Sequence, residues 1–160
     1  MKTAIAAIAL GCALAAPAHA QLITHKDLSA GMAFTMAQTA MSVCNTNGYK
    51  VSVTVVGRNG EILLQARGDG TGPHTMENSM RKAYTSRTFR IPSGEFVDRV
   101  KANPTTGAVF LANIAAAQGA LPIKVGDDVI GAIGVSGAPG GEKDEVCSKA
   151  AIDKVADMLK

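Results

Sequence analysis

Apolar residues recur at spacings of three and four near the start of the chain, and this period predicts an amphipathic helix. The helix is expected from Lys26 to about Thr46, where Asn47-Gly48 ends it. Its apolar face consists of Leu28, Met32, Met36, Ala37, Ala40 and Val43.

Two segments alternate apolar and polar residues around turn signals, which predicts two β-hairpins. The first covers residues 49–67, with Arg58-Asn59-Gly60 as its turn. The second pairs strands at 120–125 and 129–136 across Gly126-Asp127-Asp128. Three glycines and a proline make residues 68–73 a loop.

Helical patterns fill most of the remaining chain. We expect helices at 75–89 and 142–159, and a short helix after Pro92 with Ser93 as its N-cap. Residues 103–118 show no clean period. Hairpins separated by helices favour an α+β domain, in which helices pack on an antiparallel sheet, over a doubly wound fold.

The first twenty residues have the pattern of a secretory signal peptide. Lys2 gives a positive charge, residues 4–16 are apolar, and Ala18-His19-Ala20 is a small-residue cleavage site. The apolar run is shorter than the roughly 20 residues of a membrane span. We therefore expect a single mature domain, residues 21–160, in the periplasm or secreted.

The net charge of the mature chain argues against one class of function. Loss of Lys2 lowers the formal net charge from +3 to +2, with acidic and basic residues mixed along the mature chain. A nearly balanced charge argues against a dedicated nucleic-acid binder.

Two cysteines, Cys44 and Cys147, remain after the expected cleavage, because Cys12 lies in the signal segment. An even pair in an exported chain predicts a disulfide. Closing a loop of this length is worth about 4.7 kcal/mol in the chain-entropy model. The pair has no CxxC spacing, so nothing favours redox activity.

Gly131, Gly134 and Gly137 resemble a nucleotide-binding loop only superficially. Their spacing is GxxGxxG, and a hairpin precedes them instead of a βαβ unit. Close packing of a helix or loop on the sheet is the favoured explanation, although a ligand could also approach here.

Histidine is scarce in the mature chain, which keeps only His25 and His74. His74 follows Gly72-Pro73 at a helix start, where a neutral imidazole could ligate a haem iron; His25 is the alternative metal ligand. Any haem would be non-covalent, because no CxxCH is present.

The helix after His74 carries residues that could hold such a cofactor. Its cations could bind carboxylates, and its apolar side chains could contact a flat macrocycle. A solvated charged face over core methionines is the alternative. The candidate cofactor-binding residues are Met80, Arg81, Lys82, Tyr84 and Arg87.

Three segments together resemble the GlcG/HbpS-like family, a haem-binding-protein group that includes the C-terminal domain of PduO. They are GDGTGPHT at 68–75, RKAYTSRTF at 81–89, and GALPIKVGDDVIGAIGVSGAPGGEKDEVCSKAAI at 119–152. The alanine-rich run at 114–118 departs from relatives that carry a Pro- and Gly-rich loop there.

The resemblance implies a profilin-like fold, a homo-oligomer, and non-covalent haem b or, alternatively, a corrinoid such as cobalamin. It places His74 and His25 at positions from which an axial ligand could come. The expected function is haem sensing, storage or transfer by a binding protein. Binding of another small molecule, haem degradation and a purely structural assembly role stay open as alternatives.

Overall fold

The computed structural model describes residues 22–160, so the predicted signal segment lies outside the described residues. These residues form four strands, in two consecutive pairs, and four α-helices, with 3₁₀ turns at Gly107–Phe110 and Ala156–Met158. In chain order the elements are α1 (Ala30–Thr46), β1 (Ser52–Val56), β2 (Ile62–Arg67), α2 (Thr75–Phe89), α3 (Ser93–Ala102), β3 (Ala120–Val125), β4 (Asp128–Ser136) and α4 (Gly141–Val155).

The strands form one antiparallel sheet in the order β2-β1-β4-β3. The two predicted hairpins therefore lie side by side, joined through their inner strands β1 and β4. Ser52 is opposite Ser136 and Val56 is opposite Ala132 in this central pair. The prediction of an α+β fold with an antiparallel sheet is confirmed.

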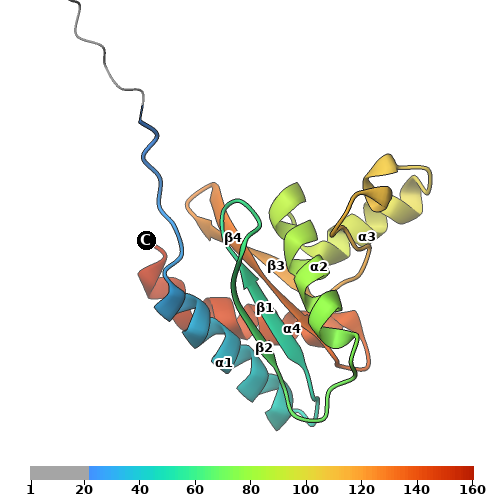
Figure 1. Cartoon of the computed structure of the whole chain (residues 1–160), viewed down its shortest axis with the longest axis horizontal. Helices are drawn as coiled ribbons and strands as arrows, with labels where there is room; N and C mark the ends of the chain where they lie inside the picture. Colours follow the sequence, from blue (N-terminus) through green and yellow to red (C-terminus); the bar gives the residue numbers. More distant parts are fainter. Residues whose placement is uncertain (1–21) are drawn as a thin grey trace, which may run out of the picture.

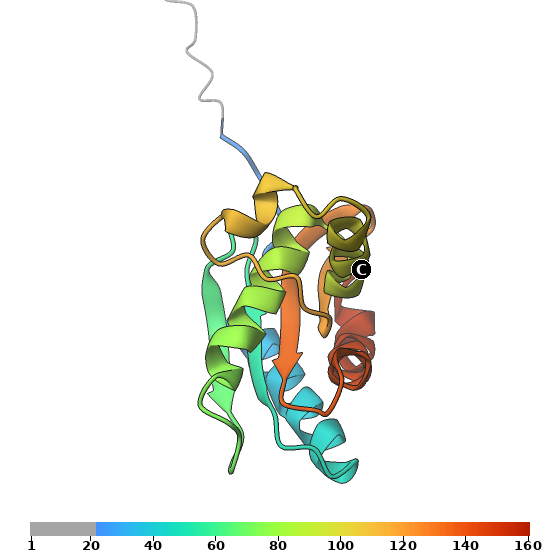
Figure 2. The same cartoon turned by 90° about the vertical axis from the view of Figure 1, so that its right-hand side faces the viewer.

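Helices cover both faces of the sheet (Figures 1 and 2): α1 and α4 pack together on one face, and α2 lies on the other. The two faces of the sheet differ in polarity, because successive side chains of β1 point to opposite faces. Val53 and Val55 point into the apolar core that α1 and α4 close, whereas Ser52 and Thr54 point at α2. The main hydrophobic core thus lies on the α1–α4 side.

The α2 side is held by short polar contacts instead of large apolar side chains. Ser52 and Thr75 hydroxyls are 2.7 Å apart, and Thr54 and Ser79 hydroxyls are 2.8 Å apart, all four buried. A side chain on Gly134 would meet the Ser79 carbonyl oxygen at 2.3 Å. The glycine therefore lets α2 lie directly on β4, which confirms close packing as its role.

Three helix boundaries differ from the sequence prediction. Helix α1 begins at Ala30, not Lys26, because the Ser29 side chain caps it by accepting from the Met32 amide. Pro92, not Ser93, is the N-cap of α3; the Ser93 hydroxyl accepts from the Ala120 amide instead. Helix α4 ends at Val155, where a 3₁₀ turn replaces the expected continuation.

The predicted disulfide between Cys44 and Cys147 is confirmed and joins α1 to α4. Both cysteines are fully buried in the core. The segment without a clear period contains one 3₁₀ turn, Gly107–Phe110, and is otherwise irregular. Within residues 22–160, every helix is too short or too polar to cross a membrane.

Candidate functional site

A cavity of about 540 Å³ opens at the end of the sheet where β1 begins and β4 ends. Its walls come from the loop before α2, from the first turns of α2, and from residues 137–141 leading into α4. The polar side chains that line it are Lys50, Thr71, His74, Thr75, Asn78, Lys82, Gln118, Ser136 and Asp144.

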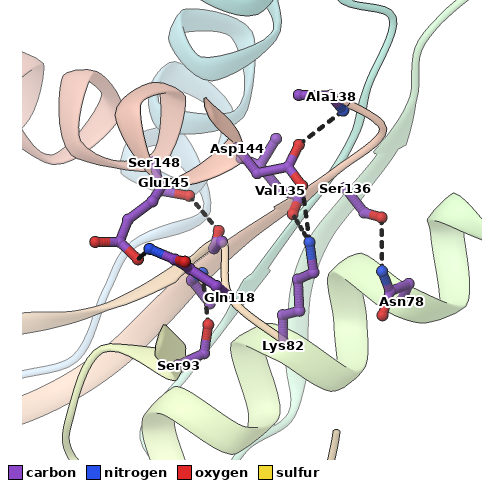
Figure 3. Close-up of polar contacts among 12 residues, drawn as sticks. Asn78, Lys82, Ser93, Gln118, Val135, Ser136, Ala138, Asp144, Glu145 and Ser148 are labelled. Atoms are coloured by element: carbon purple, nitrogen blue, oxygen red, sulfur yellow. Dashed lines mark hydrogen bonds and ion pairs between the residues drawn. The ribbon is translucent and has the colours of Figure 1, made fainter. Parts of the chain in front are cut away.

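A buried ion pair forms the floor of this cavity (Figure 3). Lys82 Nζ lies 2.8 Å from Asp144 Oδ2, and the two side chains are 5% and 3% exposed. Lys82 also donates to the Val135 carbonyl at 3.0 Å, and Asp144 Oδ1 accepts from the Ala138 amide at 2.9 Å. Burial raises the pKa of Asp144, and the Lys82 charge opposes that rise.

Asn78 and Ser136 extend the polar surface beside the ion pair. Asn78 lies one helical turn before Lys82 and donates through Nδ2 to the Ser136 hydroxyl at 2.9 Å (Figure 3). Helix periodicity brings Asn78 and Lys82 to the same side of α2. The cavity floor thus presents an amide, a hydroxyl and a charged pair together.

His74 lies at the mouth of the same cavity, as the N-cap of α2. Its ring approaches Gly72 closely and makes no hydrogen bond or ion pair with the described residues. Of the predicted site residues, Lys82 alone shares this cavity with His74.

His25 lies at the other end of β1, in a different charged network. His25 Nε2 is 2.9 Å from Asp27 Oδ2, and Arg58 Nε donates to Asp27 Oδ1 at 3.2 Å. Arg58 also donates through both terminal nitrogens to the Asp128 carboxylate, and this contact lowers the pKa of Asp128. The histidine is therefore oriented by a carboxylate that an arginine holds in place.

Arg87 lies near this second network. Together with Tyr84, Arg58 and Thr88 it lines a small cavity of about 160 Å³. Partial burial lowers the pKa of Arg87, and the neighbouring charges of Arg90 and Arg58 lower it further. Its Nε is buried without a hydrogen-bond partner among the described residues. An anionic group could satisfy that donor.

The structure does not bring the predicted cations of α2 together. Arg81 Nη2 is 2.6 Å from Glu77, Lys82 is buried against Asp144, and Arg87 lies toward the far end of the helix. Met80 is half-buried and lines neither cavity. The predicted residues divide into His74 with Lys82 at one end of the sheet and His25 with Arg87 and Tyr84 at the other.

Sequence reasoning missed Asp144, Asn78, Asp27 and Arg58. A signal existed for Asp144, which follows a glycine pair in the first turn of a helix. No spacing links Arg58 to Asp27 or Asp128, because turn and tail residues meet only when the sheet forms. Among residues 22–160, no group of three or more His, Cys, Asp and Glu could hold a bare metal ion.

Comparison of the chain with known proteins identifies related sequences and a matching family. The model of the family described as "Haem degrading protein HbpS-like" matches residues 28–153. An uncharacterized 15.0 kDa protein from the dhaT-dhaS intergenic region of Citrobacter freundii is 30% identical over 77% of this chain and 88% of its own. Protein GlcG of Escherichia coli is 29% identical over 68% of this chain and 81% of its own.

Solved structures share the fold. A crystal structure of HbpS is 32% identical with a TM-score of 0.80, covering 84% of this chain and 94% of that one. A double mutant of Streptomyces reticuli HbpS is 29% identical with a TM-score of 0.80, covering 96% and 99%. A complex of PduOC with heme is 20% identical with a TM-score of 0.72, covering 79% and 93%, and supports the fold alone. The chain belongs to the HbpS-like family.

Proposed function

We propose that the protein binds haem b non-covalently, with His25 as the axial ligand of the iron. One observation carries the choice of ligand: the His25 imidazole pairs with the Asp27 carboxylate at 2.9 Å. Histidines that bind metals commonly donate their second ring nitrogen to a carboxylate, which fixes the ring and raises its basicity. His74 has no such partner among the described residues.

Exposure and charge at the same end of the sheet also fit haem. The His25 side chain is 40% exposed, and its Nδ1 has no partner among the described residues, so a metal can reach it. Arg87 carries a positive charge and an unpaired Nε near this end, where a propionate could bind. Tyr84, beside Arg87, supplies an aromatic surface.

The comparisons support the choice of cofactor. The family description names haem, and PduOC, a protein with the same fold, was solved as a heme complex. Haem would supply redox and oxygen chemistry at the iron, and the protein would supply its ligand, orientation and surroundings. A single histidine ligand suffices to hold haem iron in many proteins. We propose that haem is held here for sensing, storage or transfer.

Haemin titration of the apoprotein tests the proposal. Wild type and His74→Ala should show the same shifted Soret band, and His25→Ala should lose that shift. Loss only in His74→Ala would move the ligand to the cavity at α2. Identical spectra for all three proteins would contradict histidine ligation. Cobalamin that binds while haemin does not would contradict haem and favour a corrinoid.

The description of the matched family favours a second candidate, haem degradation. Incubation of the haem-loaded protein with ascorbate in air tests it. Faster loss of the Soret band than for haemin bound to albumin, with release of iron, would support degradation. A stable Soret band would leave binding as the function.

Export and assembly complete the proposal. A buried disulfide between Cys44 and Cys147 supports an oxidising compartment, and we therefore propose export to the periplasm or medium. The Ala18-His19-Ala20 pattern supports cleavage after Ala20. Most soluble oligomers are homo-oligomers with closed symmetry, and we propose that this chain forms one. N-terminal sequencing of the exported protein and light scattering with and without haem test these two points.

A further inference from the structure

We propose that the cavity between α2 and α4 binds a small molecule carrying a carboxylate or phosphate group, separately from the proposed haem site. The central observation is the floor of the cavity. Lys82 is more than nine-tenths buried, and its ammonium group has three donors. Two are used, by Asp144 Oδ2 and the Val135 carbonyl, which leaves one donor for a molecule in the cavity.

The charge of the lining favours an anion. Asp144 is the one acidic residue among the described lining residues, and both of its oxygens are already bonded, to Lys82 and to the Ala138 amide. Lys50 lines the same cavity without an ion pair among the described residues. The lining therefore carries a net positive charge once Lys82 and Asp144 neutralise each other.

Two helix ends add to this charge. His74 is the N-cap of α2 and Gly140 is the N-cap of α4, and both line the cavity. Neither has a side chain that caps the helix. Helix N-termini carry a partial positive charge and free N–H groups, which anions bind readily.

Polar side chains set the size and kind of ligand. Asn78 and Ser136 lie beside the ion pair, and the Asn78 side-chain amide has one N–H donor left besides the one that Ser136 accepts. A volume of about 540 Å³ lies in the range of small-molecule sites. Tyr49 and the His74 imidazole are the only aromatic rings among the described lining residues, so the cavity suits a small hydrogen-bonding acid better than a macrocycle.

The test is calorimetric titration of the full-length mature protein at fixed ionic strength. The probes are malonate, inorganic phosphate and, as the neutral control, malonamide. Malonate or phosphate should bind saturably, and malonamide should not. Lys50→Gln and Asn78→Ala should each weaken binding about tenfold, as expected for loss of one charge-assisted hydrogen bond. Lys124→Gln removes an equal charge from an exposed site on β3 and should bind as wild type does.

The outcomes distinguish a carboxylate ligand from a phosphate ligand. They also distinguish failure of this proposal from failure of the haem proposal. Binding of malonate alone indicates a carboxylate ligand, and binding of phosphate alone indicates a phosphate ligand. No saturable binding, or equal binding by wild type, Lys50→Gln and Asn78→Ala, would overturn the proposal. His25→Ala should lose haem yet keep the anion, so failure of one site is distinguishable from failure of the other.

Discussion

Lys82 and Asp144 form an ion pair across the end of the sheet, although α2 and α4 lie on opposite faces of it. The 2.8 Å contact passes beside β4, whose Val135 carbonyl also accepts from Lys82. Residues 62 positions apart are thereby joined in a nearly inaccessible place. The pair both links two layers of the fold and forms the floor of the cavity between α2 and α4.

Removal of one partner should therefore be costly. Lys82→Met leaves a buried carboxylate and Asp144→Leu leaves a buried ammonium, and each should lower the free energy of unfolding by about 3–5 kcal/mol. The double variant should be more stable than the sum of the two losses predicts, because no charge is left unpaired. Urea unfolding of the four proteins measures this. Additive losses would show that the pair does not act as a unit.

Asp27 should control haem affinity through His25. In Asp27→Asn the imidazole loses its carboxylate partner, so haem affinity should fall about 10- to 100-fold without loss of the fold. Haemin titration measures the affinity, and circular dichroism monitors the fold. Asp98→Asn removes an equal charge from an exposed pair with Lys101 on α3 and serves as the control. Equal affinity in both variants would argue against His25 as the ligand.

Gly134 should tolerate no side chain. A Cβ there would lie 2.3 Å from the Ser79 carbonyl oxygen and 2.7 Å from the Ala83 amide nitrogen, both on the backbone of α2. Gly134→Ala should therefore lower the free energy of unfolding by about 1–3 kcal/mol. Gly107→Ala is the control, since a Cβ at that position meets no atom within 4 Å. A neutral Gly134→Ala in thermal unfolding would mean that α2 can shift away from β4.

The disulfide should supply a large share of the stability. The double variant Cys44→Ala/Cys147→Ala frees a loop with a sequence separation of 103 and should lose about 2–5 kcal/mol. Because both cysteines are fully buried, dithiothreitol should reduce native wild type only as fast as the protein opens. Quenching with a maleimide at successive times measures the rate of reduction. Rapid reduction under native conditions would contradict this burial.

Asp128 should titrate below its ordinary value of 3.8, because Arg58 donates to both of its oxygens. The stabilisation from this pair is present above pH 3.8 and is lost as the pH falls through the lowered pKa. The carboxyl ¹³C shift of Asp128 should report the lowered midpoint, and Arg58→Gln should return it toward 3.8. An unchanged midpoint in that variant would exclude Arg58 as the cause.

Periodicity predicted the fold well, because each element has a local pattern. Alternation predicted both hairpins, and the spacing of Met36, Ala40 and Val43 by four and three residues predicted α1. The start of α1 was misplaced because the Ser29 cap competes with an apolar period that continues backward to Leu28.

The site was harder to predict, because its contacts join residues distant in sequence. The disulfide could be predicted because the chain is expected to be exported and its mature part has only two cysteines. The sequence predicts Lys82 as a cofactor-binding cation, with a solvated charged face as the alternative, because helical spacing alone does not reveal a buried acid 62 residues away. Asp27 and Arg58 meet only because the segment before α1 passes the turn of the first hairpin.

Within two turns, helix α4 contacts α1 on one side and α2 and the residue before β3 on the other through its side chains. Asp144 binds Lys82 of α2, Cys147 is covalently joined to Cys44 of α1, and the Ser148 hydroxyl donates to the Gly119 carbonyl at 2.8 Å. A wall anchored by an ion pair, a covalent bond and a hydrogen bond is rigid. The opposite wall, residues 68–74, has no ion pair or disulfide among the described contacts. It is held by hydrogen bonds, such as those from the Gly68 amide to the Val51 carbonyl and from Arg67 Nη2 to the Thr71 carbonyl, both at 3.1 Å. Any adjustment of the cavity to a bound molecule is therefore expected at residues 68–74, while α4 keeps its position.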